Sequence, residues 1–183
     1  MTTFTRHKMS LDLTGFRGEA SIPAPYQVET LAPADLDALS VLELEGYRGT
    51  PDWDLVPELQ TLEGCRSFVD DLLSGRTMFS GKQGTFRPDF SFKLVTGDAP
   101  AGVIYSLFTS DEAFIIDFVL DPAHRGRGLG TQFFTYALAR YRDAGHLRAF
   151  LYVTATNYNA LHLYEKMGFQ VVDTYTTGPE TAS

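Results

Sequence analysis

The sequence predicts one α/β domain built around a mixed β-sheet, on the basis of three observations. Two apolar strands at residues 90–96 and 102–108 flank a Gly-Asp-Ala-Pro turn, as in a hairpin. A third apolar strand, at residues 113–120, runs into a glycine-rich loop and then into a long stretch of helical spacing. A strand, a short helix and a last strand follow, and this order is typical of an α/β fold with a mixed sheet.

The N-terminal part of the chain is expected to add strands and helices to this sheet. Residues 1–25 form an N-terminal extension rich in Thr, Gly and Pro, in which the alternating residues 8–13 would pair as an extra edge strand. Residues 26–183 form the single domain, and residues 26–31 are its first strand. Pro33 opens a helix that ends near Gly46, and a second helix is expected at 65–73, followed by a loop over 76–90. The buried stripe of the first helix would be Leu36, Leu39, Leu42 and Leu44.

The C-terminal part alternates helices and strands. Apolar residues recur at helical spacing from residue 129 to Gly145, which predicts a long amphipathic helix packed on the sheet. Residues 147–154 are almost continuously apolar, as expected for a buried parallel strand. A short helix follows Asn157 and ends at Gly168, and residues 169–176 form the last strand.

Composition excludes several classes of protein. At 183 residues and 44% hydrophobic content the chain can bury one sizeable core. The formal net charge of −8 argues against a general nucleic-acid binder, because that role needs a basic surface. No apolar run is long enough to cross a membrane, and we expect a cytoplasmic protein. The single cysteine, Cys65, fits a reducing compartment, either as a reactive thiol or as a small packing residue.

The glycine-rich loop is the main functional signal. A strand, a glycine loop and a helix N-terminus in this order form an anion site, because unpaired N–H groups and the helix dipole favour a phosphate. The dinucleotide fingerprint fails because Thr131 occupies the position of its third glycine, and the Gly-Lys-Ser/Thr of a P-loop is absent. The pattern that fits is Arg125-x-x-Gly128-x-Gly130.

This pattern resembles the pyrophosphate loop of the GCN5-related N-acetyltransferase (GNAT) superfamily. A second segment, Asn157-x-x-Ala160 through Tyr164 to Gly168-Phe169, is similar to the signature that this superfamily carries downstream of the loop. The resemblance covers residues 26–176 in element order and residues 113–169 in motif detail. It implies the GNAT fold, with a mostly antiparallel mixed sheet splayed at its middle strands and helices on both faces.

The resemblance also implies a binding site for acetyl-coenzyme A. Backbone groups of Val119 and Leu120 would hold the pantetheine arm and polarise the thioester carbonyl. The side chain of Arg125 or Arg127 would add charge near the 3′-phosphate or the adenine, or else lie solvated. Asn157 would contact the pantetheine arm, cap the following helix, or do both. The pyrophosphate would bind backbone N–H groups of Gly126, Arg127, Gly128, Leu129, Gly130 and Thr131.

Two side chains are candidates for moving protons. Tyr164 would be the general acid for the departing thiolate, since a phenol stays protonated at neutral pH; the alternative is a core tyrosine. Asp117 is the only acid inside an otherwise apolar strand, and we expect it to be the base that deprotonates the acceptor. A structural Asp117, bonded to a neighbouring strand or arginine, remains the alternative.

The function expected from these residues is acetyl transfer to a primary amine, of a small molecule or a peptide, by direct attack in a ternary complex. The alternative is a non-catalytic acyl-coenzyme A-binding or regulatory domain. The resemblance implies that residues 43–63 and 76–90 recognise the acceptor. An acidic stretch in the first segment hints weakly at a cationic amine, and surface acids that serve solubility are the alternative; its members are Glu43, Glu45, Asp52, Asp54 and Glu58. A homodimer is compatible with the resemblance, and the histidines show no metal-ligand spacing, so no metal is expected.

Overall fold

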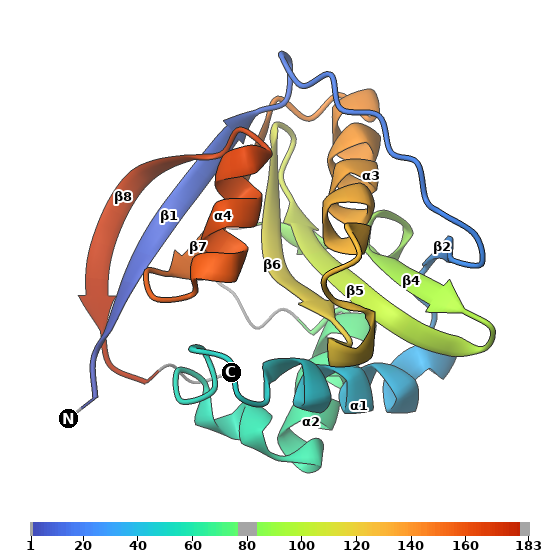
Figure 1. The fold of residues 1–183 in the computed structure, drawn as a ribbon, viewed down its shortest axis with the longest axis vertical. Coiled ribbons are helices and arrows are strands. Elements are labelled where there is room, and N and C mark those ends of the chain that lie inside the picture. Colours follow the sequence, from blue (N-terminus) through green and yellow to red (C-terminus); the bar gives the residue numbers. More distant parts are fainter. Residues whose placement is uncertain (1, 77–83, 180–183) are drawn as a thin grey trace.

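The computed structural model describes residues 2–76 and 84–179, and Figure 1 shows its fold. The helices are α1 (Leu36–Tyr47), α2 (Leu62–Leu73), α3 (Leu129–Asp143) and α4 (Tyr158–Lys166). The strands are β1 (Phe4–Asp12), β2 (Gln27–Thr30), β3 (Thr85–Phe86), β4 (Phe92–Thr96), β5 (Ala99–Phe108), β6 (Glu112–Leu120), β7 (Arg148–Thr154) and β8 (Gln170–Thr177).

The strands form one mixed sheet in the order β2-β4-β5-β6-β7-β1-β8, with β3 paired to β5 off this path. Among the described residues, every pair of neighbouring strands is antiparallel except β6 and β7, which run parallel because α3 connects them across one face. The predicted α/β fold with a mixed, mostly antiparallel sheet is therefore confirmed.

The N-terminal strand lies inside the sheet, so the expected edge position is wrong. β1 pairs antiparallel with β7 on one side and with β8 on the other, although these partners follow it by more than 130 residues. Met9 is fully buried, and Leu11 and Leu13 belong to the same hydrophobic cluster. β8 is the edge strand in place of β1, and the extension is part of the fold.

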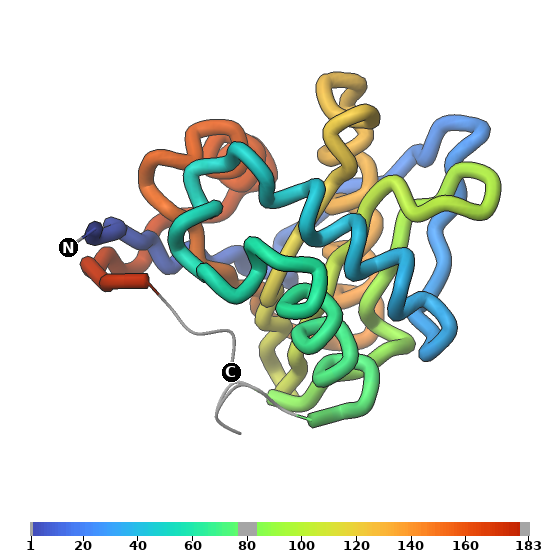
Figure 2. Tube along the Cα trace, turned by 90° about the horizontal axis from the view of Figure 1, so that it is seen from below, coloured from blue at the N-terminus to red at the C-terminus, as the bar shows by residue number. Residues whose placement is uncertain are grey.

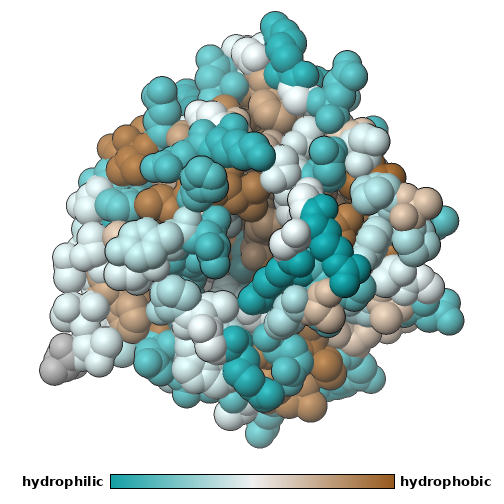
Figure 3. All heavy atoms as spheres, in the orientation of Figure 1, coloured by the Kyte–Doolittle hydropathy of each residue, from teal (hydrophilic) through white to brown (hydrophobic). Residues whose placement is uncertain are grey.

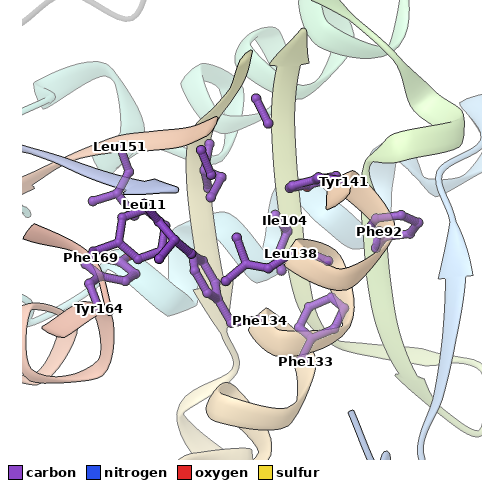
Figure 4. Close-up of a cluster of buried hydrophobic side chains, with 14 of the residues drawn as sticks. Leu11, Phe92, Ile104, Phe133, Phe134, Leu138, Tyr141, Leu151, Tyr164 and Phe169 are labelled. Atoms are coloured by element: carbon purple, nitrogen blue, oxygen red, sulfur yellow. The ribbon is translucent and has the colours of Figure 1, made fainter. Parts of the chain in front are cut away.

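Helices cover both faces of the sheet, each over its own hydrophobic cluster. α3 and α4 pack over the cluster shown in Figure 4, where Phe133, Phe134 and Leu138 of α3 meet Ile104 of β5. α1 and α2 cover the opposite face through a second cluster that includes Leu39, Leu42, Phe68 and Leu72. These two helices lie at the bottom of Figure 1 and in the foreground of Figure 2.

The structure refines several predicted boundaries. α2 begins at Leu62, earlier than expected, because the Thr61 hydroxyl accepts a hydrogen bond from the Gly64 N–H and caps the helix. Cys65 is buried with its thiol directed at the Leu59 carbonyl, and burial raises its pKa to about 12, which supports the packing interpretation. Of the loop expected at 76–90, residues 77–83 lie outside the described residues.

Within residues 2–76 and 84–179, no helix combines the length and the apolar character that a membrane span requires.

Candidate active site

The central feature of the site is the separation of β6 from β7. The two strands pair only where Glu112, Ala113 and Phe114 meet Arg148, Ala149 and Phe150. Beyond Phe114 the strands diverge, which confirms the predicted splay at the middle of the sheet. A β-bulge marks the point of divergence: Tyr105 of β5 faces Asp117 while Ser106 faces Ile115, so Ile116 is the extra residue. A bulge bends its strand and re-aims the side chains beyond it.

The bulge directs Asp117 toward α1. Ile115 and Phe118 pack on the α3 side of the sheet, whereas Ile116 packs with the α1 side. The Tyr47 hydroxyl donates to Asp117 Oδ2 at 2.7 Å, and the Phe118 N–H donates to Oδ1 at 2.8 Å. Burial raises the pKa of Asp117 to about 6, against the lowering effect of both hydrogen bonds. Asp117 is thus a carboxyl that can exchange a proton near neutral pH.

A cleft of about 1050 Å³ opens where the strands diverge. Figure 3 shows the surface hollowed between α4 and β6, with polar and apolar residues around it. Most of the expected site residues line this cleft: Asp117, Val119, Leu120, Arg125, Gly126, Gly128, Gly130, Thr131, Asn157 and Tyr164. Arg127 and Leu129 are absent from its lining, and the Leu129 side chain is buried in the core below α3.

The N-terminus of α3 presents unpaired donors to this cleft. Gly126 and Gly128 adopt left-handed backbone conformations (φ 74° and 75°), which glycine allows at little cost. Among the described residues, no backbone N–H from 126 to 131 donates a hydrogen bond, and Gly128 has no side-chain cap. The helix therefore begins with its donors and its positive dipole end directed at the cleft.

Arg125 makes contacts within the protein that the sequence did not predict. Its Nη2 donates to the Gly46 carbonyl at 2.7 Å, and both Nε and Nη2 donate to the Leu120 carbonyl. Although Arg125 is exposed and lines the cleft, its guanidinium thus connects the glycine loop to the end of α1. The Leu120 carbonyl is consequently already an acceptor in this arrangement.

Tyr164 combines a buried ring with an available hydroxyl. Its ring packs among Phe134 and Phe169, as Figure 4 shows, and the residue is only 8% exposed. Its hydroxyl has no hydrogen-bond partner in the part of the chain that the structure describes, yet the residue lines the cleft. Burial, followed by the charge of Asp117, raises the pKa of Tyr164, so the phenol is fully protonated at neutral pH.

Asn157 belongs to a polar network that the sequence did not reveal. Its Oδ1 accepts from the Ala160 N–H and caps α4, as one of the expected roles requires, while its Nδ2 donates to Asp52 Oδ2 at 2.6 Å. Asp52 also accepts from the Thr154 hydroxyl and lies 3.6 Å from the Arg6 guanidinium. The loop before α2 therefore meets the cleft through Asp52 rather than Trp53, which does not line it.

A second carboxyl, that of Glu43, lies near Asp117, whereas the sequence placed it only in an acidic stretch expected near the acceptor. Glu43 is completely buried, although an acid in a helix next to Leu42 and Leu44 has the sequence pattern of a surface position. An acid at i+4 from a buried Leu39 was the available signal, since both residues share one helix face. Among the described residues, no group of three or more potential ligands is placed to hold a metal ion.

Comparison with known proteins places this site in context. The chain is 36% identical over 108 residues to a streptothricin acetyltransferase of Streptomyces lavendulae, covering 56% of this chain and 54% of that protein. It is 28% identical over 186 residues to a mycothiol acetyltransferase of Rhodococcus opacus, covering 87% of this chain and 55% of that protein. The chain thus spans about half the length of these curated relatives.

Solved structures share the fold. A GCN5-related N-acetyltransferase from Sphaerobacter thermophilus matches 99% of this chain and 55% of its own, with a TM-score of 0.70 and 19% identity. The PaiA N-acetyltransferase of Thermoplasma acidophilum, solved with coenzyme A, matches 81% of this chain and 91% of its own, with a TM-score of 0.61 and 17% identity. The family model for the acetyltransferase (GNAT) family matches residues 66–169, which is more than half of the sequence and includes β6, the glycine loop and α4. The chain therefore belongs to the acetyltransferase (GNAT) family.

Proposed function

We propose that this protein transfers the acetyl group of acetyl-coenzyme A to a primary amine by direct attack in a ternary complex. The observation that carries the proposal is the meeting of three groups in one cleft: the unpaired donors of α3, the free hydroxyl of Tyr164 and the carboxylate of Asp117. A binding module would need only the first of these groups.

The residues at the α3 end of the cleft fit the donor. N–H groups from Gly126 to Thr131 would bind the pyrophosphate, and the edge of β6 at Val119, which has no ladder partner on the β7 side, would hold the pantetheine arm. Asn157 keeps a second amide hydrogen for the same arm. Acetyl-coenzyme A supplies an activated acyl group whose thiolate leaves more readily than the acceptor amine.

The protein's own groups would manage the protons. An alkylamine arrives as an ammonium ion, and Asp117 would take the proton that blocks its lone pair. Tyr164, protonated at neutral pH, would donate to the departing sulfur. The only cysteine is buried on the α2 side and does not line the cleft, so direct attack on the donor is favoured over an acetylated cysteine.

The names of the relatives support an amine acceptor without choosing one. One relative is named for streptothricin, and another, 31% identical over 91 residues, is the ribosomal protein bS18-alanine N-acetyltransferase of Salmonella typhimurium. We therefore include both small-molecule amines and peptide N-termini among the candidate acceptors.

Thiol release from acetyl-coenzyme A with a panel of alkylamines, aminosugars and peptide N-termini tests the proposal. We expect turnover with at least one acceptor, and Tyr164→Phe should lower kcat by about 10²-fold. Tyr158→Phe is the matched control, because Tyr158 lies on the same helix but is 72% exposed, and it should keep wild-type turnover. Tight coenzyme A binding without turnover on any acceptor would favour the non-catalytic domain instead.

A further inference from the structure

The carboxyl of Glu43 is an unusual group to bury. Glu43 has 0% exposure in α1, and neither carboxyl oxygen has a hydrogen bond of ordinary geometry to the described residues. The carboxyl nevertheless lies near enough to Asp117 for its proton to lower the pKa of that group. The hydroxyl of Tyr105, which lies close to Glu43, is also buried without a hydrogen bond of ordinary geometry to the described residues. A buried carboxylate without a partner costs several kcal/mol, so a carboxyl in this position favours its neutral form.

The groups around Glu43 supply no positive charge. Tyr47 of α1, Tyr105 of β5 and Cys65 of α2 are neutral, and Asp117 of β6 is the nearest acid. Asp52 from the loop before α2 and Tyr164 from α4 face Asp117 as well. Among the described residues, neither Glu43 nor Asp117 forms an ion pair: Arg125 is bound to carbonyls, and Arg6 lies against Asp52.

Two carboxyls in such surroundings cannot both be ionised. Burial and the nearby charge of Asp117 raise the pKa of Glu43 well above its ordinary value. Asp117 differs from Glu43 because it lines the cleft and accepts hydrogen bonds from Tyr47 and Phe118, which stabilise its charged form. The proton of the pair therefore stays on Glu43, and the negative charge stays on Asp117.

We propose that Glu43 is a positioning residue, which keeps its proton and acts through Asp117 so that the pair presents one negative charge to a cationic amine in the cleft. The proposal rests on the proposed function, since the amine is the acceptor of the acetyl group. In the step that follows, one N–H bond of the ammonium breaks and its proton goes to Asp117. The freed lone pair attacks the acetyl carbon, and the C–S bond of the donor breaks as the C–N bond forms. The departing thiolate takes a proton from Tyr164, whose hydroxyl regains one from the nitrogen of the new amide. Asp117 returns its own proton to water in the cleft, while Glu43 stays protonated throughout.

A stability measurement tests the proton on Glu43 without any turnover. Because the folded pKa of Glu43 is raised, its contribution to stability is present below its unfolded pKa of about 4.5 and is lost as pH rises toward the folded value. Glu43→Gln removes this loss. The Tm of the variant minus the Tm of the wild type should therefore increase by at least ~2 °C between pH 5 and pH 8.5. Glu45→Gln is the control, because Glu45 lies on the same helix with an exposed side chain. Its Tm difference from the wild type should not change with pH. A Tm difference between Glu43→Gln and the wild type that does not change with pH would overturn the proposal.

A pH profile of kcat/KM, with an acceptor that the wild type uses, tests the action through Asp117. Glu43→Gln keeps a neutral donor beside Asp117 and should retain activity and the acid limb of the profile. Glu43→Leu removes the donor, and the acid limb should move to higher pH because the charged form of Asp117 loses support. An inactive but folded Glu43→Gln protein would show that Glu43 works ionised, which would overturn the proposal. Absence of wild-type turnover, with the pH-dependent Tm difference intact, would count against the proposed function alone.

Discussion

At the scale of single residues, Asp117 gives the site its expected pH dependence. Its pKa of about 6 means that the ionised form of this proposed base becomes available as pH rises through that value. We expect kcat/KM to fall about tenfold per pH unit below about 6 and to level off above it. Asp117→Asn should lower kcat/KM by about 10²- to 10⁴-fold and remove the acid limb. Steady-state rates from pH 5 to 9 would check this, and an unchanged limb in Asp117→Asn would assign the titration to another group.

The same residues show what sequence patterns can and cannot predict. Asp117 was predictable because an acid inside an apolar strand needs a reason to be there. The partners of Asp117 were not predictable. The bulge at Ile116 breaks the alternation of side chains between the two faces of the sheet, which would otherwise have directed Asp117 toward α3. Glu43 and Asp52 come from segments distant in sequence, and only the packing of α1 and its following loop against β6 and α4 brings them to the site.

At the scale of elements, the junction of β6 and α3 should control donor binding. Gly128 has a φ of 75°, and a side chain there would be strained by about 1–2 kcal/mol although nothing fills the space around it. Gly128→Ala should therefore destabilise the protein and weaken coenzyme A binding, because the strained loop moves its N–H groups. Gly145→Ala is the matched control: Gly145 lies just beyond the other end of α3 with a φ of 92° and open space around it.

Calorimetric titration with coenzyme A, beside thermal unfolding, separates the two effects. Both variants should lose Tm by similar amounts, but only Gly128→Ala should bind coenzyme A more weakly. Equal affinities in the two variants would contradict a role for the loop in donor binding. This junction was predictable because its signals are local: a strand, glycines and a helix pattern in sequence. The hydrogen bond from Arg125 to the Gly46 carbonyl was not predictable, since Gly46 lies in another helix.

At the scale of the whole molecule, the N-terminal strand determines how the sheet is completed. β1 separates β7 from β8 and pairs with both, so β8 has no described neighbour in the sheet other than β1. Alternation in residues 8–13 predicted a strand, but strand order depends on contacts between residues far apart in sequence, which local patterns do not encode. Arg6 on this strand also lies against Asp52 in the cleft. β1 therefore contributes both to the pairing of the sheet and to the wall of the site.

Removing residues 1–13 should therefore abolish the native fold, because these residues are not a dispensable extension. The deletion would expose Leu151 and Val153 of β7 and would leave β8 without its hydrogen-bonding partner. We expect the shortened protein to lose its cooperative thermal transition and its near-ultraviolet circular dichroism, while a chain lacking only residues 1–3 keeps both because β1 begins at Phe4. A synthetic peptide of residues 2–14 should restore part of the signal by re-entering between β7 and β8. A shortened protein that unfolds cooperatively at the wild-type Tm would show that β1 is dispensable, and the sheet would then have to close by pairing β7 directly with β8.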